Sequence, residues 1–81
     1  MGSILREVEA LPGYRLRLCF ENGSSAEVNL EKRVKTLRFA RLAPPEVFAT
    51  ARADGDQVVW RDGGEAFRVY CSELLDAMLM D

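Results

Sequence analysis

The sequence predicts an α+β domain, with an antiparallel sheet of about five strands that begins as an N-terminal meander, a short middle helix and a C-terminal helix. Apolar and polar residues alternate through much of the chain, and this period of two is typical of half-buried strands. The last eleven residues instead carry apolar side chains at helical spacing. A chain of 81 residues has room for one domain, which we expect to span residues 1–81.

The clearest pair of strands surrounds Asn22-Gly23. Residues 14–20 and residues 26–30 each place an apolar side chain at every second position. Two alternating segments joined by Asn-Gly are a strong signal for a β-hairpin. We therefore predict that these segments are neighbouring antiparallel strands.

The apolar faces of this hairpin also predict its register. A two-residue loop would place Leu18 opposite Glu27, which sets an apolar side chain against a charged one. A loop that is one residue longer pairs Leu18 with Ala26 instead, and Gly23 then supplies the left-handed residue that such a loop requires. We predict the longer loop, which also places Arg17 opposite Glu27 on the outer face.

Upstream of this hairpin, residues 3–11 predict a first strand with Ile4 and Val8 facing inward. Pro12-Gly13 is a turn signal, so this strand is expected to pair with the next one. The first three strands then form a meander.

The middle of the chain is less regular. Pro45 favours the first turn of a short helix over residues 45–50, with Phe48 as its core anchor. The apolar residues before this helix fit no single period, so we expect irregular chain that they anchor in the core. These residues are Val34, Leu37, Phe39 and Leu42.

Residues 49–70 predict two further strands, or three short ones, with turns at Gly55 and at Gly63-Gly64. Trp60 alternates with polar neighbours on the same face as other apolar residues. It is therefore expected in the core and not in a binding site.

Ser72 is the expected N-cap of the C-terminal helix. The apolar stripe of this helix is broader than one sheet face requires, and methionine adapts readily to contacts with partners. We therefore predict a surface for self-association or for a protein partner here, formed by Leu75, Met78, Leu79 and Met80.

Composition argues against several kinds of chemistry. The chain contains no histidine, which excludes Ser-His-Asp and Cys-His nucleophiles and any zinc site built on imidazole. Cys19 and Cys71 match no metal spacing, and the acidic residues Asp56, Asp62 and Glu65 match no calcium loop. We expect no metal, no cofactor and no enzymatic activity.

Two further absences bear on location. The N-terminus lacks the basic and apolar regions of a signal peptide, and no apolar run is long enough to span a bilayer. We therefore expect a reduced cytoplasmic protein without a membrane partner.

The densest cluster of positive charge is a basic segment spanning residues 32–41. It is either a phosphate-contacting patch, whose binding would depend strongly on salt, or a solvated loop that protects a sheet edge. The net charge of −2 gives the whole chain no general attraction to nucleic acid. The candidate nucleic-acid-binding residues of this segment are Lys32, Arg33, Lys35, Arg38 and Arg41.

In the order of its motifs the chain resembles the DUF2442 family of small bacterial domains. The resemblance covers nearly the whole chain and rests on "YRLRLCFENG", "AEVNL", "LRFARL", "VFATARAD" and "VVWRDGGEAF". The chain departs from the family at Asn22-Gly23, where the family has Asp-Gly, and after Trp60, where the family often has Pro-Asn-Gly.

The resemblance implies a compact α+β fold but no catalytic residues. Family members occur alone, beside partner genes of toxin–antitoxin appearance, or fused to a helix-turn-helix DNA-binding domain. We therefore expect a protein-interaction or regulatory module of a toxin–antitoxin-like or transcription-associated system. The alternative is a nucleic-acid-associated accessory protein that uses the basic segment.

Overall fold

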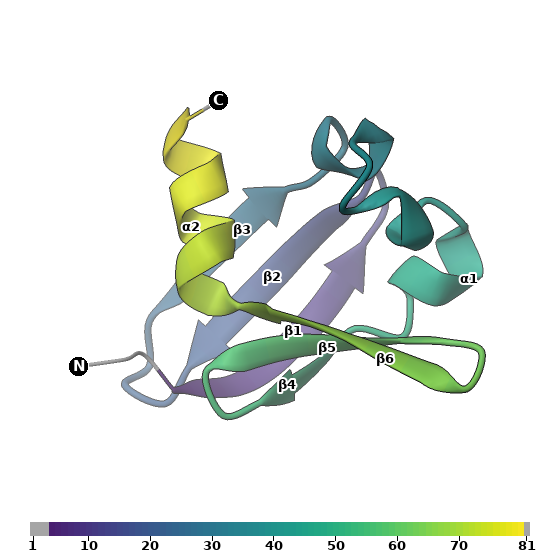
Figure 1. Cartoon of the computed structure of the whole chain (residues 1–81). Helices are drawn as coiled ribbons and strands as arrows, with labels where there is room; N and C mark the ends of the chain where they lie inside the picture. Colours follow the sequence, from purple (N-terminus) through teal and green to yellow (C-terminus); the bar gives the residue numbers. More distant parts are fainter. Residues whose placement is uncertain (1–3, 81) are drawn as a thin grey trace.

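Six antiparallel strands form two three-stranded sheets in the computed structural model, which describes residues 4–80 and, in the last helix, side chains as far as residue 76 (Figure 1). The first sheet has the order β1 (Leu5–Leu11), β2 (Arg15–Phe20) and β3 (Ser25–Asn29). The second has the order β4 (Arg52–Asp54), β5 (Gln57–Asp62) and β6 (Glu65–Tyr70). Consecutive strands pair in both sheets, so each sheet is a meander.

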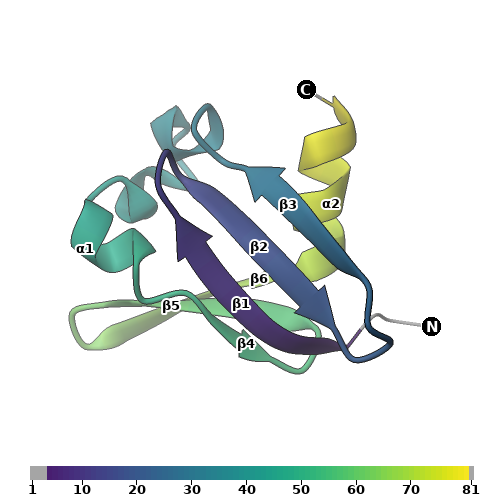
Figure 2. The same cartoon turned by 180° about the vertical axis from the view of Figure 1, so that it is seen from behind.

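The α+β class is confirmed, but the prediction of a single sheet of about five strands is wrong. β1 and β4 meet where the Leu5 N–H donates to the Gly55 carbonyl at 2.8 Å, and the two sheets then diverge and cross each other (Figure 2). Each sheet has one apolar face. Stacking these faces removes both from water, which one extended sheet under a single short helix would not achieve.

The two sheets are connected by short helices without any strand. These are two 3-10 helices, η1 (Arg33–Lys35) and η2 (Ala40–Leu42), followed by α1 (Pro45–Phe48). Pro45 occupies the first turn of α1, as predicted, because its fixed φ suits this position. Phe48 is buried, which confirms it as the anchor of the short helix.

The prediction that four apolar residues anchor this connection is only partly correct. Val34 and Leu42 are buried and Phe39 is half-buried, but Leu37 is 97% exposed. Leu37 lies between η1 and η2, and each of these helices turns its own apolar residue inward. Between the two helices, Thr36, Leu37 and Arg38 are exposed, and Phe39 turns back toward the core.

The predicted register of the β2–β3 hairpin is confirmed. Leu18 pairs with Ala26, and Arg17 lies opposite Glu27. Gly23 has a φ of +89°, as the longer loop requires. Although Arg17 lies opposite Glu27, it contacts Glu9, its direct partner on β1, at 2.8 Å, and Glu27 instead contacts Arg15 diagonally at 3.0 Å.

The prediction that Ile4 faces inward is wrong. Ile4 is 45% exposed, and its neighbour Leu5 is buried. The pairing of β1 with β2 shifts between Leu5 and Glu7. This irregularity moves the inward position by one residue and still lets Val8 pack against the core.

Trp60 is completely buried, as predicted, and lies beside aromatic residues of α1 and β6. Its ring centroid is 5.9 Å from that of Phe67 and 6.4 Å from that of Phe48. The indole Nε1 is buried without a hydrogen-bond partner in the described part of the chain. The tryptophan therefore contributes to the core through packing alone.

The C-terminal helix α2 (Cys71–Met80) follows β6 directly. Ser72 lies inside its first turn, so the prediction of Ser72 as N-cap is wrong; the strand leads straight into the helix and leaves no position for a separate capping loop. Leu74 is 1% exposed, and α2 lies against β3 and β6. Within residues 4–80, no helix combines the length and hydropathy that crossing a membrane requires.

Replacing Gly23 by alanine is expected to lower the free energy of unfolding by about 1 kcal/mol, because a Cβ is strained at positive φ. Urea denaturation measures the loss. The matched control is Gly64→Ala, at a turn position outside the left-handed region with open space around it, which is expected to change stability less. Equal losses in the two variants would contradict the strained loop.

Candidate functional site

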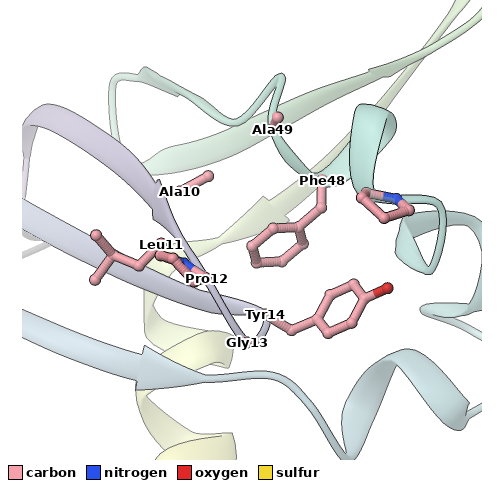
Figure 3. Close-up of a pocket in the computed structure, with 8 residues that line it drawn as sticks. Ala10, Leu11, Pro12, Gly13, Tyr14, Phe48 and Ala49 are labelled. Atoms are coloured by element: carbon pink, nitrogen blue, oxygen red, sulfur yellow. The ribbon is translucent and has the colours of Figure 1, made fainter.

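A surface pocket of about 360 Å³ lies between the β1–β2 turn and α1 (Figure 3). The turn contributes one wall and the short helix contributes the other. The phenyl ring of Phe48 and the phenol ring of Tyr14 lie between these two walls (Figure 3). The lining residues are Ala10, Leu11, Pro12, Gly13, Tyr14, Pro45, Phe48 and Ala49.

The backbone at the turn positions Tyr14 in an unusual way. Gly13 has a φ of +79°, and Tyr14 follows with a φ of +59°, which makes it the one non-glycine residue with positive φ in the described chain. A bulky residue in this region is strained and persists only where its surroundings hold it. Strain of this kind is concentrated at functional sites, which makes the pocket the leading candidate.

Two contacts hold the Tyr14 side chain in place. Its hydroxyl donates a hydrogen bond to the carbonyl of Ala43, which lies just after η2. Its ring meets that of Phe48 edge to face, with centroids 5.2 Å apart and an interplanar angle of 75°. The aromatic surface of the pocket is therefore fixed before any ligand arrives.

The pocket offers shape and apolar surface, and its lining carries no charged side chain. Among its eight lining residues, the Tyr14 hydroxyl is the one polar side-chain group, and it is already bonded to a carbonyl. Such a site suits an apolar side chain or a small apolar ligand.

The structure disperses the basic segment. Arg38 contacts Glu73 of α2 at 2.7 Å. Arg41 contacts Glu65 at 2.9 Å and Asp62 at 3.6 Å. Two of the five candidate phosphate contacts are thus engaged with carboxylates of distant segments.

The other three basic residues lie before these two. Lys32 and Lys35 are exposed, and Arg33 is half-buried in η1. In residues 4–80, neither lysine forms an ion pair. The positive charge of Lys32 and Lys35 near η1 therefore stays unpaired in the described part of the chain, whereas the charge of Arg38 and Arg41 around η2 is balanced by carboxylates.

The predicted surface on α2 is only partly described. Leu75 is half-buried and packs against the core. The side chains of Met78, Leu79 and Met80 lie outside the described residues. The prediction of a partner surface on this helix stays a prediction.

Neither cysteine forms a disulfide. Burial raises the pKa of the Cys71 thiol, and the nearby Asp56 carboxylate raises it further. The thiol at this position is therefore kept protonated, and a protonated thiol is a poor nucleophile. Cys19 is half-buried on the outer side of β2.

The acidic residues considered for a cation are not brought together. Asp62 and Glu65 lie at the β5–β6 turn, and both contact Arg41. Asp56 lies at the opposite end of β5. No cluster of three or more potential metal ligands occurs among residues 4–80.

Sequence reasoning missed the pocket, although its two walls carried a signal. Pro12-Gly13 is a turn signal directly before Tyr14, and Pro44-Pro45 marks the start of the short helix that carries Phe48. Nothing in the sequence shows that these two segments, about thirty residues apart, face each other. Comparison with protein-family models, with curated proteins and with solved structures finds no match to this chain, so the resemblance to DUF2442 stays a prediction.

Proposed function

We propose that this chain is a protein-interaction module that holds an apolar side chain of a partner in the pocket between the β1–β2 turn and α1. The observation that carries the proposal is the preorganised aromatic surface formed by Tyr14 and Phe48. Binding energy at protein interfaces is concentrated where an anchor side chain fills such a pocket. A rigid site also avoids the entropic cost of ordering side chains on binding.

The pocket size fits this role. A volume of about 360 Å³ is near the lower end for small-molecule sites and accommodates one or two side chains. The lining carries no charge, so we expect the partner to contribute an aliphatic or aromatic residue. A regulatory role in a toxin–antitoxin-like or transcription-associated system, which the resemblance to DUF2442 implies, remains part of this proposal.

Affinity purification from the organism that encodes the chain tests the proposal. Ala49 lies exposed at the pocket rim, so Ala49→Glu places a charge beside the apolar lining with little effect on the core. Burying that charge against an apolar partner is costly. We expect the variant to recover at least about tenfold less of a partner that the unmodified chain recovers in about 0.5 M salt.

The matched control is Ala40→Glu, the same change at an exposed position of η2 outside the pocket. It is expected to recover the partner normally. Equal recovery by all three proteins would show that the pocket is not the binding site. Recovery of nucleic acid alone, lost steeply as salt rises, would instead favour the basic segment.

A further inference from the structure

The outer edge of β6 has no strand beside it in residues 4–80. β6 is an end strand of its sheet and pairs only with β5 among the described residues. The other end strand, β4, meets β1, and α2 lies against β3 and against the end of β6 that leads into it. α2 rises away from the end of β6 and does not run along it (Figures 1 and 2). β6 is therefore the edge most available to another chain.

The hydrogen-bond pattern identifies the backbone groups on this edge. Cys71 N–H donates to the Asp56 carbonyl at 2.9 Å, which continues the β5–β6 ladder past the end of β6. Bonded and non-bonded pairs alternate in an antiparallel ladder. The N–H and C=O groups of Ala66, Arg68 and Tyr70 therefore point away from β5.

The outward N–H groups of these three residues, and the C=O groups of Ala66 and Arg68, have no hydrogen-bond partner within residues 4–80, whereas the Tyr70 carbonyl directly precedes α2 and accepts the first bond of that helix. The side chains of the same three residues are also exposed, and Tyr70 is 49% exposed. An unpaired and accessible strand edge is a template for the addition of another strand. Backbone groups of three alternate residues on β6 are therefore available to bind an added strand.

The charge beside this edge indicates the chemistry of the added strand. Val58 and Trp60 face the core, so alternate residues of the second sheet form its solvent face. The charged residues of this face are Arg52, Arg61, Arg68 and Asp54. Three arginines and one aspartate give the face a charge of +2, although the whole chain has −2.

The arginines retain donors for a ligand. Arg68 contacts Asp54 at 2.6 Å through one nitrogen, Nη1, and a guanidinium has five N–H donors. Arg52 and Arg61 form no ion pair in the described part of the chain. A carboxylate placed beside Arg68 would therefore find positive charge and guanidinium N–H donors that are not yet used.

We propose that the edge of β6 binds an extended acidic segment of a partner protein as a seventh strand, with a carboxylate facing Arg68. This inference rests on the proposed function, an interaction module, but it uses a different surface from the pocket. A second copy of the chain fits less well, because pairing two β6 edges in full overlap sets Arg68 opposite its own equivalent. Like charges directly opposite on neighbouring strands are destabilising.

Nuclear magnetic resonance titration with two synthetic peptides tests the inference. Both peptides have seven residues and blocked ends, with the sequence Thr-Val-Thr-Xaa-Thr-Val-Thr, in which Xaa is the central residue. The central residue is glutamate in one and lysine in the other. We expect the glutamate peptide to shift the backbone amides of Ala66, Arg68 and Tyr70, to slow their hydrogen exchange, and to bind about fivefold more tightly than the lysine peptide.

Two charge-reversal variants locate the effect. Arg68→Glu is expected to reverse the preference between the peptides. Arg52→Glu makes the same charge change two strands away from the edge, and it is expected to keep the preference. The amide spectrum of each variant verifies that it is folded.

Three outcomes would overturn the inference. The β6 amides could stay unchanged up to millimolar peptide, or Arg52→Glu could act as strongly as Arg68→Glu, which would indicate general charge attraction. Sedimentation could instead show that the chain dimerises through β6 and excludes the peptide. The pocket variant Ala49→Glu leaves β6 intact and is expected to bind the glutamate peptide normally. Peptide binding therefore reports on the β6 edge alone, whereas recovery of the partner by Ala49→Glu reports on the pocket of the proposed function.

Discussion

Trp60→Ala is expected to lower the free energy of unfolding by about 3–5 kcal/mol, the range for truncating a buried large aromatic residue. Trp60 is completely buried and contacts Phe48 and Phe67, so its removal leaves a cavity between the two sheets. A domain of this size is stabilised by only about 4–12 kcal/mol. The variant is therefore expected to be near the limit of folding at room temperature.

Urea denaturation followed by far-ultraviolet circular dichroism measures this loss, since the variant has no tryptophan fluorescence. Trp60→Phe is the control, because it keeps an aromatic ring and removes the indole N–H that has no partner in the described chain. Leaving a buried donor unsatisfied costs about 1–3 kcal/mol, so its removal offsets part of the lost packing. A loss below about 1 kcal/mol for Trp60→Ala would contradict a buried tryptophan.

Leu74→Ala is expected to lower the free energy of unfolding by about 2–4 kcal/mol. Leu74 is 1% exposed and belongs to the same core cluster as the two sheets. Leu74 and Cys71 are the two residues in the described part of α2 that are buried in this core. The loss is expected to be independent of protein concentration, because the helix packs on its own chain.

Leu75→Ala is the matched control for this prediction. It makes the same chemical change one residue later, at a half-buried position. We expect it to lower the free energy of unfolding by less than half as much as Leu74→Ala does. Thermal or urea denaturation at two protein concentrations checks both variants. If the effect of Leu74→Ala depended on concentration, α2 would instead pack on a neighbouring molecule.

The candidate site shows where reasoning from sequence stops. Tyr14 and Phe48 were each expected to face the core, and each does contribute to it. Their edge-to-face contact, and the hydrogen bond from Tyr14 to Ala43, join segments that are about thirty residues apart. No local pattern encodes such a contact, so the pocket was not predicted.

The basic segment shows the same limit for electrostatics. Its five positive residues lie within residues 32–41, and the sequence left open whether they form a phosphate-contacting patch or a solvated loop. The fold brings Glu73 to Arg38, and Glu65 to Arg41, from the C-terminal third of the chain. The charge of a surface depends on which distant segments meet there.

The open edge of β6 also depends on the tertiary structure. The sequence predicted a strand ending at Tyr70, with Trp60 and Val69 on one face. Which strand ends a sheet depends on how many strands join it. The predicted sheet of about five strands had no strand order beyond its N-terminal meander, so the open edge of β6 was not identified.

By itself the sequence determined the hairpins, the bulged loop at Gly23, the short helix at Pro45 and the inward face of most strands. These features follow from interactions between residues close in the chain, where alternation and turn chemistry leave few alternatives. Only the tertiary structure decided that the strands divide into two crossed sheets, that Leu5 replaces Ile4 in the core, and that Tyr14 meets Phe48. The reason is physical, because burial of apolar area is non-directional and many arrangements of the same hairpins satisfy the same pattern.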